Sequence, residues 1–248
     1  MVRRWRTRDV AKGLTARLGS IDADALAKML MAGVETATSA RWDAAVARAA
    51  SLPGDVRPEK IRALSASFAR ELGAVGAAAG MAAATPAVGT AATLMTAMVE
   101  LSWFTARAGD LILTIAALHG RPTPTVDERR AWVLALLIFG RTARQGMTGV
   151  ANEMGAGLSD LSPTRLSIAT LRATNGAMSR LLVRGYGARR GAIALGTALP
   201  LGVGAVVGGS ANFVAIRKLA AQADSFFARL PYSSIDATSI EVAGELRR

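Results

Sequence analysis

The sequence predicts an all-α protein, a helical bundle that contains two glycine-rich, proline-interrupted apolar helical hairpins. Three observations support this fold class. No stretch alternates apolar and polar residues between turn signals, so no β-strand is expected. Apolar residues recur at helical spacing, as at Ile61, Leu64, Phe68 and Leu72. The 248 residues are 51% hydrophobic and 19% charged, which is enough apolar material for a sizeable core.

Three helices are expected in the first half of the chain. Asp22 is a candidate N-cap for a helix that reaches about Ala50. A second helix begins near Pro58 and ends at Thr85-Pro86, because proline disfavours continuation of a helix. A long helix then covers about residues 89–119, with Gly120 as its C-terminal cap.

Three further helices are expected in the second half. Thr125 and Glu128 form a capping box, and residues 131–139 have the composition of a buried helix too short to cross a bilayer. Ser162-Pro163 is a typical N-cap and first helical residue, which predicts a helix to about Val183. A last helix covers about residues 211–230. These patterns suggest a basic N-terminal helical region at 1–57, a helical domain at 58–230 and a polar tail at 231–248.

Two long runs, residues 72–99 and 191–216, carry no charged residue. Each exceeds the roughly 20 residues that a helix needs to cross a bilayer, but Pro86 and Pro200 divide them. Shallow or re-entrant membrane insertion, a close-packed soluble core and a conventional membrane span all remain open.

Glycines in and next to these runs recur at small-xxx-small spacing, the pattern that lets two helix backbones approach closely. The pairs are Gly76 with Gly80, Gly187 with Gly191, and Gly204 with Gly208. A nucleotide-binding loop is disfavoured, because Val207 stands where a Rossmann fingerprint requires its third glycine and no GK[ST] sequence occurs.

The net charge of +12 raises the question of an anionic partner. Aromatic residues make up only 5% of the chain, whereas a nucleic-acid-binding surface interleaves aromatic and basic residues. Anionic lipid headgroups fit the pattern better than nucleic acid. The basic N-terminus is followed by no apolar run, so a cleaved secretory signal is not expected.

One charged stripe lies on the long helix predicted at 89–119. Glu100, Arg107 and Asp110 share a helical face, so the arginine can reach a carboxylate one turn away. The stripe is interpreted as an internal ion pair, as a solvated helix face, or as a pocket for a lipid headgroup or a partner subunit. No catalytic residue, cofactor or metal site is predicted, because the chain has no cysteine and a single histidine, His119, placed as a helix C-terminal residue.

The sequence resembles the EcsC protein family. The resemblance covers roughly residues 60 to 230 and rests on "GAAAGMAAATPAVGTAATLMTAMVELSWFTARAGDLILTIAALHG" followed by "ALPLGVGAVVGGSANF", which closes on Gly-x-x-Asn. It adds Asn212 to the candidate polar contacts. It implies a bacterial, helical, envelope-linked protein of no established activity.

The expectation that follows is a non-enzymatic, membrane-associated helical protein on the cytoplasmic face of a bacterial membrane, an accessory to envelope transport or lipid organisation, with anionic lipids and a membrane transporter as partners. A soluble helical carrier of lipids or other apolar ligands in the cytoplasm is the alternative. An enzyme of unrecognised type is a third hypothesis.

Overall fold

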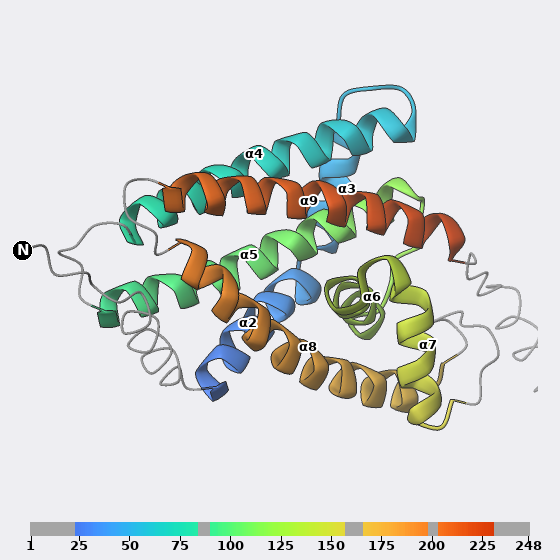
Figure 1. Ribbon diagram of the computed structural model, residues 1–248. Helices are drawn as coiled ribbons and strands as arrows, with labels where there is room; N and C mark the ends of the chain where they lie inside the picture. Colours follow the sequence, from blue (N-terminus) through green and yellow to red (C-terminus); the bar gives the residue numbers. More distant parts are fainter. Residues whose placement is uncertain (1–22, 84–89, 157–165, 198–202, 231–248) are drawn as a thin grey trace, which may run out of the picture.

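The computed structural model describes residues 23–83, 90–156, 166–197 and 203–230, and it leaves out the side chains of 23–26, 76, 79–83, 90–101, 186–197, 203–209 and 211. The described residues form only helices and their connections, without a strand (Figure 1), which confirms the all-α fold class. The helices are α2 (Ala23–Ser39), α3 (Trp42–Ser51), α4 (Arg57–Ala83), α5 (Thr90–Leu118), α6 (Val126–Phe139), the 3-10 turn η1 (Gly140–Thr142), α7 (Ala143–Glu153), α8 (Ile168–Thr197) and α9 (Val203–Arg229).

Helix α5 lies at the centre of the bundle. It contacts α2, α3, α4, α6 and α9, and its last eight residues, 111–118, are apolar except for Thr114. Leu111, Ile112, Leu113 and Ile115 are completely buried. A helix that is apolar all round belongs in a core rather than on a surface, and the sequence from residue 111 to 118 therefore accounts for the central position of α5.

Helices α4 and α9 form the most extensive helix pair of the fold. They run antiparallel along one side of the molecule (Figure 1). The amide Nδ2 of Asn212 on α9 donates to the main-chain carbonyl of Leu72 on α4, 3.3 Å away, and this bond sets their register.

The two uncharged runs meet at one end of the molecule. The first run forms the end of α4 and the start of α5, and the second forms the end of α8 and the start of α9. These four helix ends gather at the left of Figure 1. Two runs that are far apart in the sequence, 72–99 and 191–216, thus bring their described parts to one charge-free end.

The helix predicted from Asp22 to Ala50 is in fact two helices, so that prediction was wrong. Helix α2 ends at Ser39 and α3 begins at Trp42. The buried guanidinium of Arg129 donates to the carbonyls of Thr38, at 2.7 Å, and Ser39, at 3.2 Å. These carbonyls are among those that a helix C-terminus leaves unpaired, so an arginine from α6 stabilises the chain reversal at this point.

The predicted boundaries of α8 and α9 were also wrong. Helix α8 starts at Ile168, where the Ser167 hydroxyl accepts from the main-chain N–H of Thr170 at 3.1 Å, and it continues beyond Val183 to Thr197. Helix α9 begins at Val203 rather than Ala211. An interior glycine costs a helix only about 1 kcal/mol relative to alanine, which packed helices can tolerate. The predicted N-cap Ser162 lies outside the described residues.

Other local signals were confirmed. The capping box is present, with reciprocal hydrogen bonds between Thr125 and Glu128 at the start of α6. Gly120 follows α5 with a φ of +66°, a conformation that glycine adopts without strain. Helices α4 and α5 also flank the predicted break around Pro86.

Helix α7 was not predicted. Its sequence "ARQGMTGVANE" is mostly polar and contains glycine, and the helix buries only one narrow apolar side, which includes Met147 and Val150.

Candidate functional site

The predicted pair on α5 belongs to a larger group of charges, here called the Arg107 network: Arg41, Glu71, Arg107 and Asp110. Arg107 donates through Nη1 to Asp110 Oδ2 at 2.8 Å, as its spacing predicts. It also binds both carboxylate oxygens of Glu71 on α4, with Nε–Oε1 at 2.9 Å and Nη2–Oε2 at 2.5 Å. Such a two-point arrangement is the strongest form of an arginine–carboxylate pair.

Asp110 is the most deeply buried member of the network. Its side chain is 2% exposed, and its Oδ2 accepts from Arg107 and, at 2.6 Å, from Nη1 of Arg41 in the α2–α3 connection. A carboxylate buried to this extent requires cationic or hydrogen-bonding partners. Arg41 and Arg107 supply these partners, so Asp110 links α5 to the segment that joins α2 and α3.

Phe68 lies beneath the network and provides an aromatic face for two cations. The guanidinium carbon of Arg107 is 4.4 Å from the centre of the Phe68 ring, and that of Arg48 is 5.5 Å from it. Burial lowers the pKa of Arg107, but the bonds to Glu71 and Asp110 outweigh this effect and raise its pKa overall. Arg107 therefore stays charged.

The network is arranged to hold helices together. Two guanidinium groups and two carboxylates satisfy one another across the α2–α3 connection, α4 and α5, and the hydrogen bonds of these four side chains involve no nucleophile beside a base. Glu100 lies on the same helix, but its side chain is outside the described part of α5. Asn212 is not a member, because its amide joins α9 to the Leu72 carbonyl. Sequence reasoning missed Arg41 and Glu71.

His119, the residue that follows the C-terminal end of α5, forms a second polar contact. Its Nε2 lies 2.8 Å from Asp224 Oδ1 on α9, and its ring packs against Phe227, with 6.1 Å between the ring centres. Burial, followed by the positive charges of Arg57 and Arg121, lowers the pKa of His119 despite the bond to Asp224. The predicted helix-end position of His119 is correct, and its side chain additionally ties α5 to α9.

Arg121 performs for α9 the function that Arg129 performs for α2. The Nη2 atom of buried Arg121 donates to the carbonyls of Phe227 and, at 2.6 Å, Leu230 at the end of α9. A cation here also interacts favourably with the negative end of the helix dipole. The sequence gives one weak signal for this contact, an arginine directly after the Gly120 cap, but not the helix it reaches.

The predicted close-packing glycines lie on α4 and α9. If the register set by the Asn212–Leu72 bond continues along the antiparallel pair, Gly76 comes opposite Gly208, and Gly80 opposite Gly204. The contacts around these four glycines lie outside the described part of the structure, so their role in close packing stays a prediction. A close approach that sequence reasoning missed lies between α2 and α5, where a Cβ on Gly33 would come within 2.5 Å of the Ser102 carbonyl oxygen.

Within the described ranges, no group of three or more histidine or acidic side chains could hold a metal ion. No helix in that same part of the chain has both the length and the hydropathy needed to cross a membrane.

Comparisons with protein-family models, with curated proteins and with solved structures at the fold level gave no match.

Proposed function

We propose that the protein is a non-enzymatic, peripheral or re-entrant membrane protein that inserts the charge-free end of its helices into one leaflet of a bilayer. The observation that carries this proposal is that the described parts of the two uncharged runs, 72–83 and 90–99 from the first and 191–197 and 203–216 from the second, lie toward one end of the fold (Figure 1). An end without a charged residue can leave water at little cost, whereas each buried charge would oppose insertion.

The dimensions of this end favour shallow insertion. At about 1.5 Å per residue, the uncharged parts of α4 (72–83) and α9 (203–216) each extend about 20 Å. The hydrocarbon core of a bilayer is about 30 Å thick. The two arms are therefore longer than one leaflet and shorter than the whole core, and each hairpin enters and leaves on the same side.

Basic residues border the charge-free end on the side of the protein body. Arg70 on α4 and Arg217 and Lys218 on α9 are exposed, and Arg189 and Arg190 precede the uncharged end of α8. Cations at the level of the headgroups are attracted to anionic lipids, by about 1 kcal/mol each. Anionic lipids are concentrated in the cytoplasmic leaflet, so these basic residues favour binding to the cytoplasmic face of the membrane.

The resemblance to the EcsC family concerns the same segments in part, since each of the two quoted motifs includes residues of one uncharged run. We therefore include in the proposal an EcsC-like role as an accessory to an envelope transporter or to lipid organisation in a bacterium. The principal alternative is a soluble carrier of lipids or other apolar ligands.

Vesicle flotation tests the membrane proposal. The protein is expected to float with vesicles that contain anionic phospholipid and to stay bound after a wash in about 1 M salt, where the Debye length falls to about 3 Å and surface attraction is screened. Release by salt would contradict insertion, and no binding at all would favour the soluble carrier.

A fluorescent label can locate the inserted end, because the chain has no native cysteine. A polarity-sensitive dye on Thr90→Cys, at the start of α5, is expected to shift to shorter wavelength when vesicles are added. Ser225→Cys, an exposed position near the other end of α9, is the matched control and should not respond. Equal shifts at both positions would contradict the proposed orientation.

A further inference from the structure

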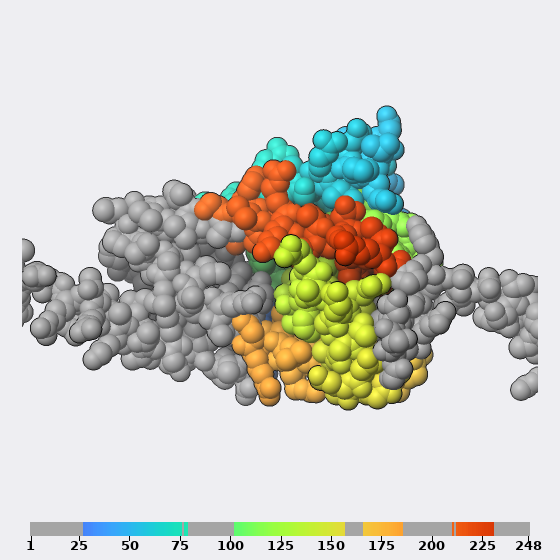
Figure 2. Space-filling view, turned by 45° about the vertical axis from the view of Figure 1, so that its right-hand side comes forward, coloured from blue at the N-terminus to red at the C-terminus, as the bar shows by residue number. Residues whose placement is uncertain are grey.

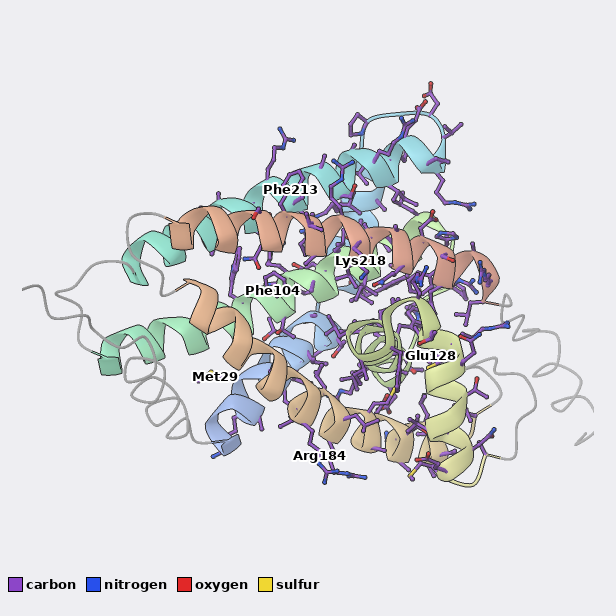
Figure 3. The ribbon with its side chains drawn as sticks, viewed as in Figure 1. Met29, Phe104, Glu128, Arg184, Phe213 and Lys218 are labelled. Atoms are coloured by element: carbon purple, nitrogen blue, oxygen red, sulfur yellow. The ribbon has the colours of Figure 1, made fainter. Side chains whose placement is uncertain are left out.

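An open, mainly apolar groove of about 340 Å³ lies between α4 and α9. It is lined by Ala69, Arg70 and Gly73 from α4 and by Ser210, Phe213 and Val214 from α9. Val214 is 63% exposed, so its apolar side chain is accessible to a ligand in the groove. Figure 3 places Phe213 on the side of α9 that faces α4. The volume lies within the range of roughly 300–1,000 Å³ that small-molecule sites occupy.

The groove lies where the charged part of the helix pair gives way to the uncharged part. On α4, Arg70 is followed after one turn by Gly73, and no charge occurs beyond Glu71. On α9, the order is reversed, from Ser210 in the uncharged run to Arg217 and Lys218. Because the helices are antiparallel, both place their basic residues at the same end of the groove (Figure 1).

Those basic residues are available to an anion. Arg70, Arg217 and Lys218 are exposed. The Nε of Arg70 donates to the Ala66 carbonyl of its own helix at 3.2 Å, and the guanidinium of Arg217 lies over the Phe213 ring, 5.8 Å from its centre. The nearest acidic residue in sequence, Glu71, has both carboxylate oxygens bound to Arg107. The groove thus combines an apolar floor with a cationic end that no neighbouring carboxylate of α4 or α9 is shown to neutralise.

We propose that this groove binds a single anionic phospholipid, with the lipid phosphate on Arg70 and Arg217 and one acyl chain lying over Gly73 and Ser210 toward the charge-free end. This inference rests on the proposed membrane association and adds the lipid class and the residues that select it. Arginine suits the phosphate because its planar guanidinium donates two parallel hydrogen bonds. The acyl chain would then point from the basic residues toward the charge-free end, in the same direction as the acyl chains of the leaflet that the hairpins would enter.

Binding of a short-chain phosphatidylglycerol, kept below its critical micelle concentration, tests the groove without a membrane. The variant Arg70→Gln/Arg217→Gln should lose affinity by about tenfold or more, since it removes two charge-assisted contacts. Arg180→Gln/Arg184→Gln is the matched control, with the same loss of charge at two exposed positions on α8. Arg184 lies on the lower side of the molecule in Figure 3, away from Phe213 and Lys218. The control should bind within about twofold of the parent chain.

A second variant addresses the acyl chain. Val214→Glu places a carboxylate in the groove at an exposed position that the fold can tolerate, and it should also abolish binding. Phosphatidylcholine of the same chain length should bind more weakly, and inorganic phosphate should not compete. Competition by inorganic phosphate at millimolar concentration would overturn the lipid assignment in favour of a free-phosphate site.

The outcomes separate this inference from the proposed function. Equal loss of affinity in the arginine variant and its control would overturn the groove as the site. Vesicle flotation without any binding of the short-chain lipid would also overturn the groove and leave membrane association intact. Short-chain binding that depends on Arg70 and Arg217, together with no flotation, would sustain the groove and overturn membrane insertion.

Discussion

At the scale of single residues, Asp110 illustrates which contacts a sequence can predict. The pairing with Arg107 follows from a spacing of three residues along one helix. The contact with Arg41 joins residues 69 apart in the sequence, and the Arg107–Glu71 contact joins residues 36 apart. No periodicity connects such positions, because they meet only after α3 and α4 have packed on α5. Half of the network was therefore beyond sequence reasoning.

Replacement of Arg107 tests the strength of the network. Arg107→Ala should lower the free energy of unfolding by about 3 kcal/mol, toward the lower end of the range for broken buried pairs, because Arg41 still binds Asp110. The matched control is Arg172→Ala. Arg172 pairs with Asp127 at 3.0 Å but is 69% exposed, so its loss should cost about 0–1 kcal/mol. Urea unfolding measures both values, and equal values would contradict a structural role for the network.

The burial of His119 predicts a pH dependence of stability. Its pKa in the folded state is lowered, chiefly by burial, whereas in the unfolded chain it is about 6.5. Below that value the unfolded chain binds a proton that the folded protein resists. The contribution of His119 to the free energy of unfolding should therefore be present in full above about pH 6.5. As the pH falls below this value, the free energy of unfolding should decrease by up to about 1.4 kcal/mol per pH unit.

The assignment of this effect is straightforward, because His119 is the only histidine in the chain. His119→Gln can still donate a hydrogen bond to Asp224, and its unfolding free energy should be nearly constant between about pH 5 and pH 7. Chemical unfolding at several pH values checks this expectation. Parallel curves for the parent chain and the variant would show that His119 does not titrate as its burial predicts.

At the scale of helices, α2 and α5 approach each other closely at Gly33 and Gly109. A Cβ on Gly109 would clash with the Cβ of Ala37, and one on Gly33 would lie 2.7 Å from the Thr105 Cβ. A search for pairs of glycines spaced by four within one helix passes over this crossing, since each helix contributes a single glycine. The sequence contains the residues but not the angle at which the helices meet.

Substitution at this crossing gives the next prediction. Gly109→Ala should destabilise the fold by about 1–3 kcal/mol, because the added methyl group must push α2 away from α5. Gly149→Ala is the matched control in α7, where a Cβ would meet no atom within 4 Å. That change should stabilise the protein by up to about 1 kcal/mol through helix propensity alone. Thermal unfolding distinguishes the opposite signs, and stabilisation by both changes would contradict the close approach.

Helix ends divide into those set locally and those set by distant residues. The capping box of Thr125 and Glu128 and the Gly120 cap were predictable, because each lies within a few residues of the helix end it defines. The end of α2 was not predictable, because Arg129 of α6 binds its last carbonyls. Helix α8 was cut short in the prediction because glycine propensity was given more weight than tertiary packing.

At the scale of the whole molecule, the charge-free end exists only because α4 and α9 run antiparallel. The sequence predicted two separate apolar hairpins, and each is interrupted at its proline. The fold then places the uncharged half of each helix beside that of the other, and gives α4 and α9 the most extensive contact in the structure. This arrangement brings the two separate apolar runs of the sequence to one end of the fold, the end that the proposed function places in a leaflet.

Cross-linking tests that arrangement directly, because a chain without cysteine gives no background. Continuing the register from the Asn212–Leu72 bond places residue 76 opposite residue 208. Disulfides form only between residues whose Cα atoms are about 4.4–6.8 Å apart, so Gly76→Cys/Gly208→Cys should cross-link rapidly under mild oxidation. Gly76→Cys/Ser225→Cys, with its second cysteine near the other end of α9, should not. Peptide mapping after proteolysis measures both. If only the control pair cross-linked, α4 and α9 would have a different register, and the uncharged runs would not share one end.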